Sequence, residues 1–230
     1  MPETKRIVVL ANSRKPPGRC VAGIELVDGD AADWVRPVGD RAGAGLTRPE
    51  RLLADQSEPL PLDVVDFVMD RPVPVDCHRE NWLLRSGSPR GRVGTFDFDD
   101  LDALASNPKA LWSNDAESQL GVNDWIAESE LEEYTHSILL LERRDVVLQA
   151  RRNPWSREQE LRAEFDHRGV MYLLKVTDPV YEERYLTGVD GDVQILDAFL
   201  TISLGVPWSK SDAPRYSSKL VAALIERPGD

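Results

Sequence analysis

Short apolar runs of strand length, separated by proline, glycine and polar turn residues, constrain this fold more than any other feature of the chain. Lys5–Ala11 and Cys20–Leu26 are β-branched runs that flank a loop containing Pro16, Pro17 and Gly18. Asp33–Val38 alternates apolar and polar residues, as a half-buried strand does. Runs of this length and composition, bounded by turn residues, predict strands rather than helices.

The same pattern continues to about residue 95 and returns after residue 135. Leu62–Val75 is rich in β-forming residues, and its prolines Pro72 and Pro74 favour the edge of a sheet. Asn81–Arg85 is a further short strand. His167-Arg168-Gly169 predicts a hairpin turn within the second set of strands, which comprises Ser137–Leu141, Val146–Ala150, Arg162–Asp166, Val170–Thr177, Phe199–Leu204 and Lys219–Ile225.

The middle of the chain differs in charge. Between Phe96 and Glu133 eleven acidic residues stand against Lys109 alone, so this segment carries −10 of the net charge of −12. Asp99–Ala105 and Asp124–Leu131 are predicted to be helical, the first with Asp97 or Asp99 as its cap. We therefore expect a mainly β protein in which an acidic helical connector, residues 96–134, joins a first β-barrel unit, residues 1–95, to a second, residues 135–230.

Composition excludes several classes of protein. The chain has 230 residues, 41% of them hydrophobic, and resembles an ordinary globular protein. No run approaches the roughly 20 apolar residues that span a bilayer, so we expect no membrane association and a cytoplasmic location. Two cysteines and three histidines at unrelated spacings indicate neither a disulfide framework nor a metal site. Nucleotide-cofactor motifs are missing, so we expect no cofactor.

Two features favour contact with a polyanion or a base. Ser13, Arg14, Lys15 and Arg19 occupy a proline-stiffened loop, where guanidinium, ammonium and hydroxyl groups suit phosphate; the alternative is a solvated surface loop. Trp34 and Arg36 lie two residues apart and therefore on one face of a strand. That face is either a stacking platform for a base or a core tryptophan beside a peripheral arginine.

The densest polar cluster is Cys77-His78-Arg79-Glu80-Asn81-Trp82. Cys77 and His78 are weak candidates for a nucleophile and a base, because adjacent strand residues point to opposite faces. Asn81 and Trp82 instead suit reading and stacking a base. Two further candidates are Asp178, in an ordinary Thr177-Asp178-Pro179 turn, and Lys219, a cation that opens an apolar strand.

Several phrases in a shared order resemble the bacterial dual-OB-domain proteins. The phrases are Ser13-Arg14-Lys15, Gly18-Arg19-Cys20-Val21-Ala22-Gly23, Trp34-Val35-Arg36-Pro37, His78-Arg79-Glu80-Asn81-Trp82, Val176-Thr177-Asp178-Pro179, Leu200-Thr201-Ile202-Ser203-Leu204-Gly205 and Lys219-Leu220-Val221-Ala222-Ala223. The resemblance implies two OB-like barrels and recognition of nucleic acid or a nucleotide, within bacterial defence or conflict systems. It supplies no catalytic residue, and the candidate contacts are Ser13, Arg14, Lys15, Arg19, Trp34, Arg36, His78, Asn81, Trp82, Thr177, Asp178 and Lys219.

Three functions follow from these observations. The first is a module that binds single-stranded nucleic acid or a nucleotide through the basic loop and the aromatic face. The second is an enzyme that acts on a nucleotide or a small phosphorylated metabolite, with His78, Cys77 or Asp178 as acid, base or nucleophile. The third is a protein-interaction subunit that contacts its partner through residues 97–133. The sequence favours binding over catalysis.

Overall fold

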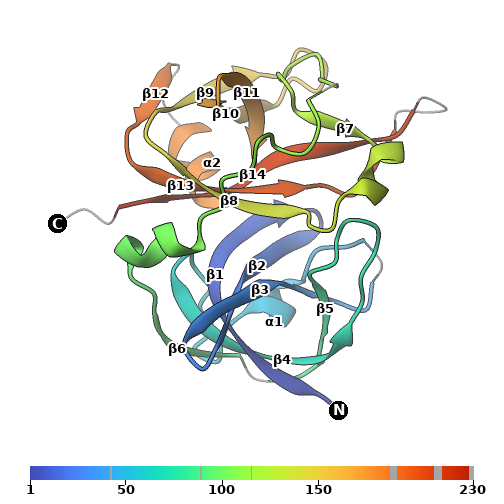
Figure 1. Cartoon of the computed structure of the whole chain (residues 1–230), viewed down its shortest axis with the longest axis vertical. Coiled ribbons are helices and arrows are strands. Elements are labelled where there is room, and N and C mark those ends of the chain that lie inside the picture. The colour runs from blue at the N-terminus through green and yellow to red at the C-terminus, as the bar shows by residue number, and fades with distance from the viewer. Residues whose placement is uncertain (42, 89, 115, 187–190, 210–213, 228–230) are drawn as a thin grey trace. The chain divides into compact units, whose positions relative to one another are not determined.

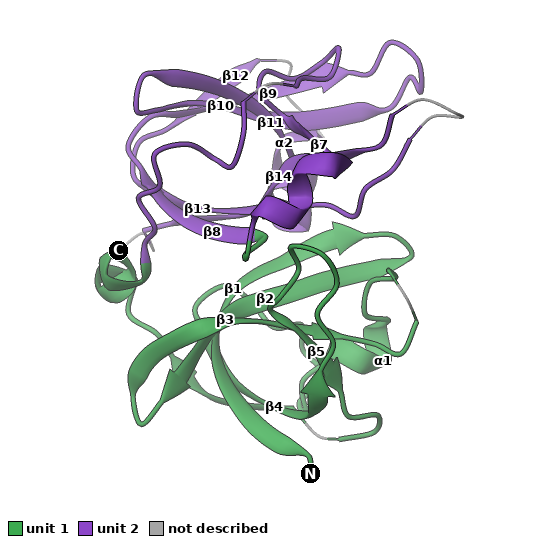
Figure 2. Ribbon diagram, turned by 45° about the vertical axis from the view of Figure 1, so that its right-hand side comes forward, with its two compact units in different colours: residues 1–104, 135–137 green, residues 105–134, 138–230 purple. Residues whose placement is uncertain are grey.

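The computed structural model describes residues 1–41, 43–88, 90–114, 116–186, 191–209 and 214–227. The chain forms two compact units, which Figure 2 colours separately. Unit 1 comprises Met1–Leu104 together with Thr135–Ser137, and unit 2 comprises Ala105–Tyr134 together with Ile138–Asp230. The chain therefore leaves unit 1, enters unit 2, returns for three residues and then completes unit 2.

Unit 1 is a barrel of antiparallel strands with one parallel pair (Figure 1). Its strands follow the order β1-β2-β3-β5-β4-β6, and an additional pairing of β1 with β4 closes five of them. The one parallel pair joins β3 to β5. The elements are β1 (Glu3–Lys15), β2 (Gly18–Val27), β3 (Asp30–Val38), α1 (Arg48–Arg51), β4 (Asp63–Pro72), β5 (Asn81–Leu84), β6 (Gly91–Thr95) and the 3₁₀ helix η1 (Phe98–Leu104).

Closure of this barrel depends on β1, which pairs with two different strands. Residues 3–8 of β1 pair with β4, and residues 7–15 pair with β2. An irregularity in register between Val9 and Ala11 marks the point where the strand changes partner, as bulges do where strands bend. The side chains inside the barrel form one buried cluster, with members Ile7, Val9, Val21, Val35, Leu46, Leu53, Val65, Phe67, Met69 and Leu84.

Unit 2 repeats this arrangement with its first strand divided in two. Its sheet follows the order β12-β9-β10-β11-β14-β13-β8, with β7 paired to β14. β8 pairs with β13 and β9 pairs with β10, while β11 and β14 are parallel. The elements are β7 (Trp125–Ala127), the 3₁₀ helix η2 (Glu128–Glu133), β8 (Ile138–Arg143), β9 (Val146–Arg152), β10 (Gln159–His167), β11 (Val170–Val176), α2 (Pro179–Leu186), β12 (Asp192–Ile195), β13 (Ala198–Leu204) and β14 (Tyr216–Glu226).

The two units therefore share one topology. β8 and β9 together take the place of β1, and β10, β11, β13 and β14 take the places of β2, β3, β4 and β5. A short helix follows the third strand in both units. Five-stranded Greek-key barrels of this kind are OB folds, which bind ligands on the face of strands 2 and 3 and through the loops 1–2 and 4–5. The prediction of a mainly β chain with two OB-like barrels is confirmed.

Most predicted strands are present, although several bounds differ. The hairpin at His167-Arg168-Gly169 is confirmed, since Arg168 and Gly169 have φ of 56° and 82°, as a two-residue turn between twisted strands requires. The prediction that Leu62–Val75 forms an edge strand is wrong, because β4 pairs with β1, β5 and β6. Pro72 is tolerated there because it ends the strand.

The acidic helical connector is not found as expected. Within Asp124–Leu131, residues 125–127 form β7, because their backbone groups pair with β14, and only the short η2 follows. Strand pairing has therefore overridden the local helical preference of this acidic stretch. β6, β7, β12 and α2 were not predicted. Among the described residues, no helix combines the length and the apolar character needed to cross a membrane.

Replacing Gly23 tests the closure of barrel 1. A Cβ at Gly23 would lie 1.9 Å from the backbone oxygen of Val8, whereas a Cβ at Gly94 in β6 meets nothing within 4 Å. We expect Gly23→Ala to lower the free energy of unfolding by about 2–3 kcal/mol, because β1 and β2 must separate, and Gly94→Ala to have little effect. Urea unfolding followed by circular dichroism measures both. Equal stabilities for the two variants would show that β1 and β2 do not approach so closely.

Candidate functional site

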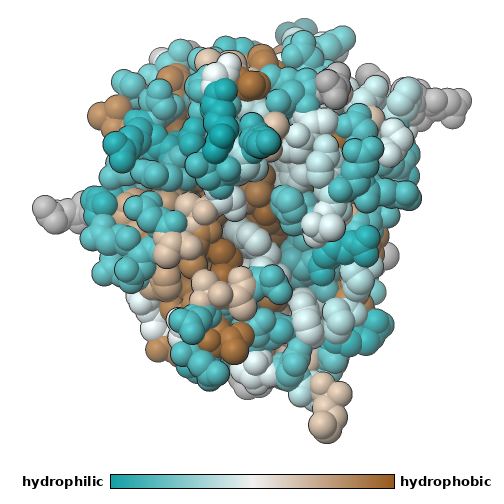
Figure 3. Space-filling model, viewed as in Figure 1, coloured by the Kyte–Doolittle hydropathy of each residue, from teal (hydrophilic) through white to brown (hydrophobic). Residues whose placement is uncertain are grey.

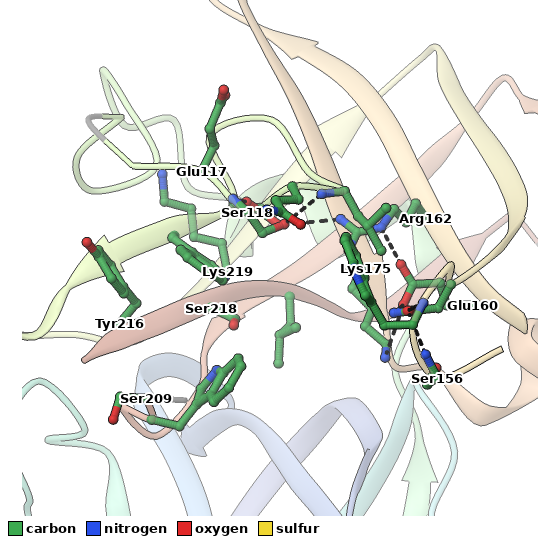
Figure 4. Close-up of a pocket in the computed structure, with 18 of the residues that line it drawn as sticks. Glu117, Ser118, Ser156, Glu160, Arg162, Lys175, Ser209, Tyr216, Ser218 and Lys219 are labelled. Atoms are coloured by element: carbon green, nitrogen blue, oxygen red, sulfur yellow. Dashed lines mark hydrogen bonds and ion pairs between the residues drawn. The ribbon is translucent and has the colours of Figure 1, made fainter. Parts of the chain in front are cut away.

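A pocket of about 830 Å³ lies on the outer face of the unit 2 barrel, within the range of small-ligand sites. We call it the aromatic pocket. Its floor is formed by β10, β11 and β14, and its walls by the loops β9–β10 and β13–β14 and by residues 117–125. Figure 4 shows most of its lining residues, which are Glu117, Ser118, Gln119, Leu120, Asp124, Trp125, Asn153, Trp155, Ser156, Glu160, Arg162, Lys175, Trp208, Ser209, Pro214, Tyr216, Ser218, Lys219 and Leu220.

Strand alternation explains why polar side chains form the floor. In β10, Leu161 and Ala163 are buried apolar residues that face the core. Glu160 and Arg162 alternate with them along the strand and therefore point to the other face. Lys175 of β11 lies directly opposite Arg162 in the antiparallel register. Three charged residues of two neighbouring strands therefore meet on one surface.

Arg162 holds this floor together. Its Nε donates to Oε1 of Glu160 at 2.8 Å, and its Nη1 donates to Oδ2 of Asp124 at 3.3 Å and to the backbone oxygen of Leu173 at 3.3 Å. Lys175 extends the row, with Nζ 3.6 Å from Oε2 of Glu160. Figure 4 shows this network along one side of the pocket, opposite Tyr216.

The two carboxylates that contact Arg162 are held in place by further hydrogen bonds. Ser118 donates to both oxygens of Asp124, through its backbone N–H and its hydroxyl, each at 2.6 Å. Burial raises the pKa of Glu160, but the hydrogen bond and charge of Arg162 outweigh burial and hold that pKa below its ordinary value. The buried guanidinium of Arg162 is therefore paired with two carboxylates.

Aromatic rings line the rest of the pocket. Trp125 stacks on Tyr216 with ring centroids 4.9 Å apart and meets Trp208 edge-on at 6.4 Å. Trp208 is 51% exposed and Trp155 is 60% exposed, although tryptophan is highly buried on average. Hydrophilic residues cover most of the face drawn in Figure 3, where hydrophobic residues reach the surface in patches. Two exposed indoles at one pocket therefore offer stacking surfaces that the fold itself leaves uncovered.

Lys219 is the one predicted contact residue that lines the aromatic pocket. Its side chain is fully buried, and Nζ donates to the backbone oxygen of Ser113 and to Oδ1 of Asn114 at 3.3 Å. Nζ also lies 5.3 Å from the ring centroid of Tyr172. Lys219 thus fastens residues 113–114 to the barrel from beneath the pocket.

Two predicted residues, Arg36 of β3 and Asn81 of β5, belong to a polar cluster in unit 1. Arg36, 3% exposed, lies with Nη2 2.7 Å from Oε1 of Glu80 and donates from Nη2 to the hydroxyl of Ser137 at 2.8 Å. Its Nη1 donates to Oδ1 of Asn81 at 3.5 Å, and the Ser137 hydroxyl donates to Glu80. This cluster holds Thr135–Ser137 against unit 1, so Arg36 is covered by the chain itself.

The predicted basic loop is the tip of the β1–β2 hairpin. Arg14 and Arg19 are paired across the hairpin, with Arg14 exposed and Arg19 half-buried 3.9 Å from Glu58. Ser13 is buried, with its hydroxyl 3.5 Å from the backbone oxygen of Cys20. Lys15 is half-buried, and burial lowers the pKa of its ammonium. The hairpin therefore presents Arg14 to solvent more than its other candidates.

The structure does not bring the two predicted indoles together. Val35 belongs to the core cluster, so Trp34 lies on the outer face of β3. Trp82 packs against that core cluster, and Nζ of Lys5 lies 4.0 Å from the centroid of its ring. A single stacking surface that includes both rings is therefore not present in unit 1.

Cys77 and His78 lie in the turn between β4 and β5, not in a strand as expected. Their side chains do not point to opposite faces, because Sγ lies 3.8 Å from Nδ1. Both residues are buried, and burial raises the pKa of Cys77 to about 11. At neutral pH this thiol is protonated and is a weak nucleophile.

Thr177 and Asp178 join β11 to α2. The hydroxyl and the N–H of Thr177 donate to the backbone oxygen of Val221. Asp178 accepts from the N–H groups of Val180 at 2.9 Å and Leu224 at 3.2 Å, and burial raises the pKa of its carboxyl. Both side chains are used in joining these elements. In the part of the chain that the structure describes, no group of three or more metal-ligating side chains is placed to hold an ion.

The rings of the aromatic pocket were missed because they come from distant segments. Trp125 and Tyr216 begin β7 and β14, whereas Trp155 and Trp208 lie in the loops β9–β10 and β13–β14, and no local pattern links them. The signal available in the sequence was weak: a tryptophan in each of the two loops that correspond to loops 1–2 and 4–5 of an OB barrel.

Removal of Glu80 tests the buried cluster of unit 1. Glu80→Ala leaves the Arg36 guanidinium buried without its carboxylate, and we expect the free energy of unfolding to fall by about 3–5 kcal/mol. The matched control is Asp70→Ala, which removes the exposed ion pair with Arg85 and should change stability by less than about 1 kcal/mol. Urea denaturation compares the two; a Glu80→Ala loss no larger than that of Asp70→Ala contradicts the role of the cluster.

Alkylation tests whether Cys77 is activated. With a pKa of about 11, about one thiol in a thousand is ionised at pH 8, and the thiolate is the reactive form. In a Cys20→Ser variant, we expect iodoacetamide to modify native Cys77 far more slowly than a free thiol, and fully after unfolding in urea. Modification of the native protein at the rate of a free cysteine would instead support a catalytic thiol.

Comparison with known proteins agrees with this architecture. The family model of the dual OB-containing domain matches residues 5–224. No curated protein matches the sequence. Because the match covers nearly the whole chain and the structure contains two barrels of the same topology, this chain belongs to the dual OB-containing domain family.

Proposed function

We propose that this protein is a binding module for single-stranded nucleic acid or a nucleotide, and that its ligand enters the aromatic pocket of unit 2. The observation that carries the proposal is the exposure of Trp155 and Trp208 at the walls of a pocket of about 830 Å³. Both indoles come from the loops by which OB barrels contact ligands.

The chemistry of the pocket suits an unpaired base. Bases stack on aromatic side chains whatever their sequence, because every base has a π face. A base that leaves the stack is typically bound between aromatic side chains and read through hydrogen bonds to its edge. The polar floor around Arg162 and Glu160 supplies such hydrogen-bonding groups beneath the rings.

The other functions predicted from the sequence have less support. As a thiol with a raised pKa, Cys77 is a poor nucleophile, and the carboxylate of Asp178 accepts backbone hydrogen bonds that fasten α2 and β14. Contact with a protein partner through residues 97–133 stays a prediction. A binding module without catalysis is therefore the function that the contacts support best.

Loss of either exposed indole should weaken ligand binding. A stacked aromatic side chain contributes about 1–3 kcal/mol per base, so we expect Trp155→Ala and Trp208→Ala each to raise the dissociation constant of a labelled single-stranded decanucleotide roughly 5- to 150-fold. Fluorescence anisotropy of the labelled strand, with DNA and RNA versions, provides the measurement, and calorimetry extends it to mononucleotides.

The control for this experiment is Leu196→Ala. Leu196 is 66% exposed in unit 2 and does not line the pocket, so its loss removes exposed apolar surface without removing a stacking ring. We expect its affinity to equal that of the unmodified protein. Equal affinities for Trp208→Ala, Trp155→Ala and Leu196→Ala would place the ligand elsewhere, and no binding of either ligand class to the unmodified protein would overturn the proposal.

A further inference from the structure

We propose that the aromatic pocket binds the nucleobase of its ligand and leaves the phosphate outside. This inference rests on the proposed function and specifies which part of the ligand the pocket recognises. It predicts that a nucleoside binds about as tightly as the corresponding nucleotide. The observations behind it are the charge balance of the pocket and the contacts of its cations.

Among the described residues that line the pocket, positive and negative side chains are equal in number. The carboxylates are Glu117, Asp124 and Glu160, and the cations are Arg162, Lys175 and Lys219. Sites that bind phosphate through charge need an excess of cations. A phosphate at this floor would instead meet Asp124 and Glu160, both within ion-pair distance of Arg162, and like charges repel strongly where water is excluded.

Each cation among the described lining residues has an acidic or a polar partner. Arg162 uses Nε and Nη1 in its contacts with Glu160, Asp124 and the backbone. Lys175 lies 3.6 Å from Glu160, and Lys219 is held by Ser113 and Asn114. A phosphate in contact with Arg162 or Lys175 would lie beside Glu160, whose negative charge opposes it.

The groups that remain for a ligand suit an uncharged heteroaromatic ring. The exposed faces of Trp155 and Trp208 provide stacking. Among the described residues, Oε2 of Glu160 has only long contacts, 3.4 Å to Nδ2 of Asn153 and 3.6 Å to Nζ of Lys175. This oxygen is therefore placed to accept an N–H from the edge of a base, as carboxylates do from base amines.

Calorimetry of the full chain with each ribonucleoside and its 5′-monophosphate, at 50 and 300 mM NaCl, tests the inference. We expect each pair of dissociation constants to agree within about threefold, and each constant to change by less than about threefold with salt. An ion pair between the phosphate and a cation would instead be screened and weakened by the added salt. Trp208→Ala should weaken nucleoside and nucleotide binding equally, because both place the base in the pocket.

Glu160→Gln provides a gain-of-binding test. Removal of this charge leaves Lys175 without its carboxylate, so we expect the monophosphate to bind about tenfold more tightly than the nucleoside in this variant. Glu158→Gln is the matched control, because Glu158 is exposed in the adjoining loop and does not line the pocket. We expect Glu158→Gln to bind the nucleoside and the monophosphate with equal dissociation constants. Should Glu160→Gln fail to fold, the inference is still tested by the calorimetry of the unmodified protein with nucleoside and monophosphate at the two salt concentrations.

The outcomes separate this inference from the proposed function. A tenfold preference of the unmodified protein for monophosphates, or a steep loss of affinity with salt, would overturn the exclusion of phosphate while single-strand binding stands. Identical ligand preferences of folded Glu160→Gln and Glu158→Gln would also overturn it. If nucleosides, nucleotides and single strands all fail to bind, both proposals are wrong.

Discussion

A first strand shared between two partners is the constraint on which both barrels depend. In unit 1 the single strand β1 leaves β4 and joins β2 near Val9, and in unit 2 the change of partner falls between β8 and β9. Because each barrel closes through this strand, its second and third strands have one face toward the core and the other face toward the outside. That placement is what makes a surface on β10 and β11 available for a ligand.

The two units use this topology differently. In unit 1 the outward-facing Arg36 is covered by Glu80 and by Ser137 of the returning segment. Its guanidinium therefore holds the segment Thr135–Ser137 in place. In unit 2 the outward-facing Arg162 is balanced by Asp124 and Glu160 but stays at the floor of a pocket. The buried arginine of unit 1 therefore stabilises the packing of the chain, whereas the buried arginine of unit 2 lies, with its charge compensated, at the surface of a pocket.

The strands were predictable because alternation and turn residues are local signals, as at Asp33–Val38 and at the Arg168-Gly169 turn. β7 and β12 were not predicted because three or four residues carry too little periodicity. β7 is a strand because its backbone pairs with β14. The site was harder to predict. Most of the predicted contacts lie in unit 1, whereas the rings of the aromatic pocket come together only when the barrel of unit 2 has closed.

The charge of the chain bears on which contacts with a ligand it favours. A net charge of −12 opposes any ligand held mainly by its phosphates, because such binding depends on a surplus of cations. A pocket whose cations are each compensated, and whose exposed surface is aromatic, does not require that surplus. The ring of a base is bound by stacking and by hydrogen bonds to its edge, which depend little on the charge of the whole protein. The acidity of the chain and the neutrality of the pocket thus favour the same kind of ligand contact.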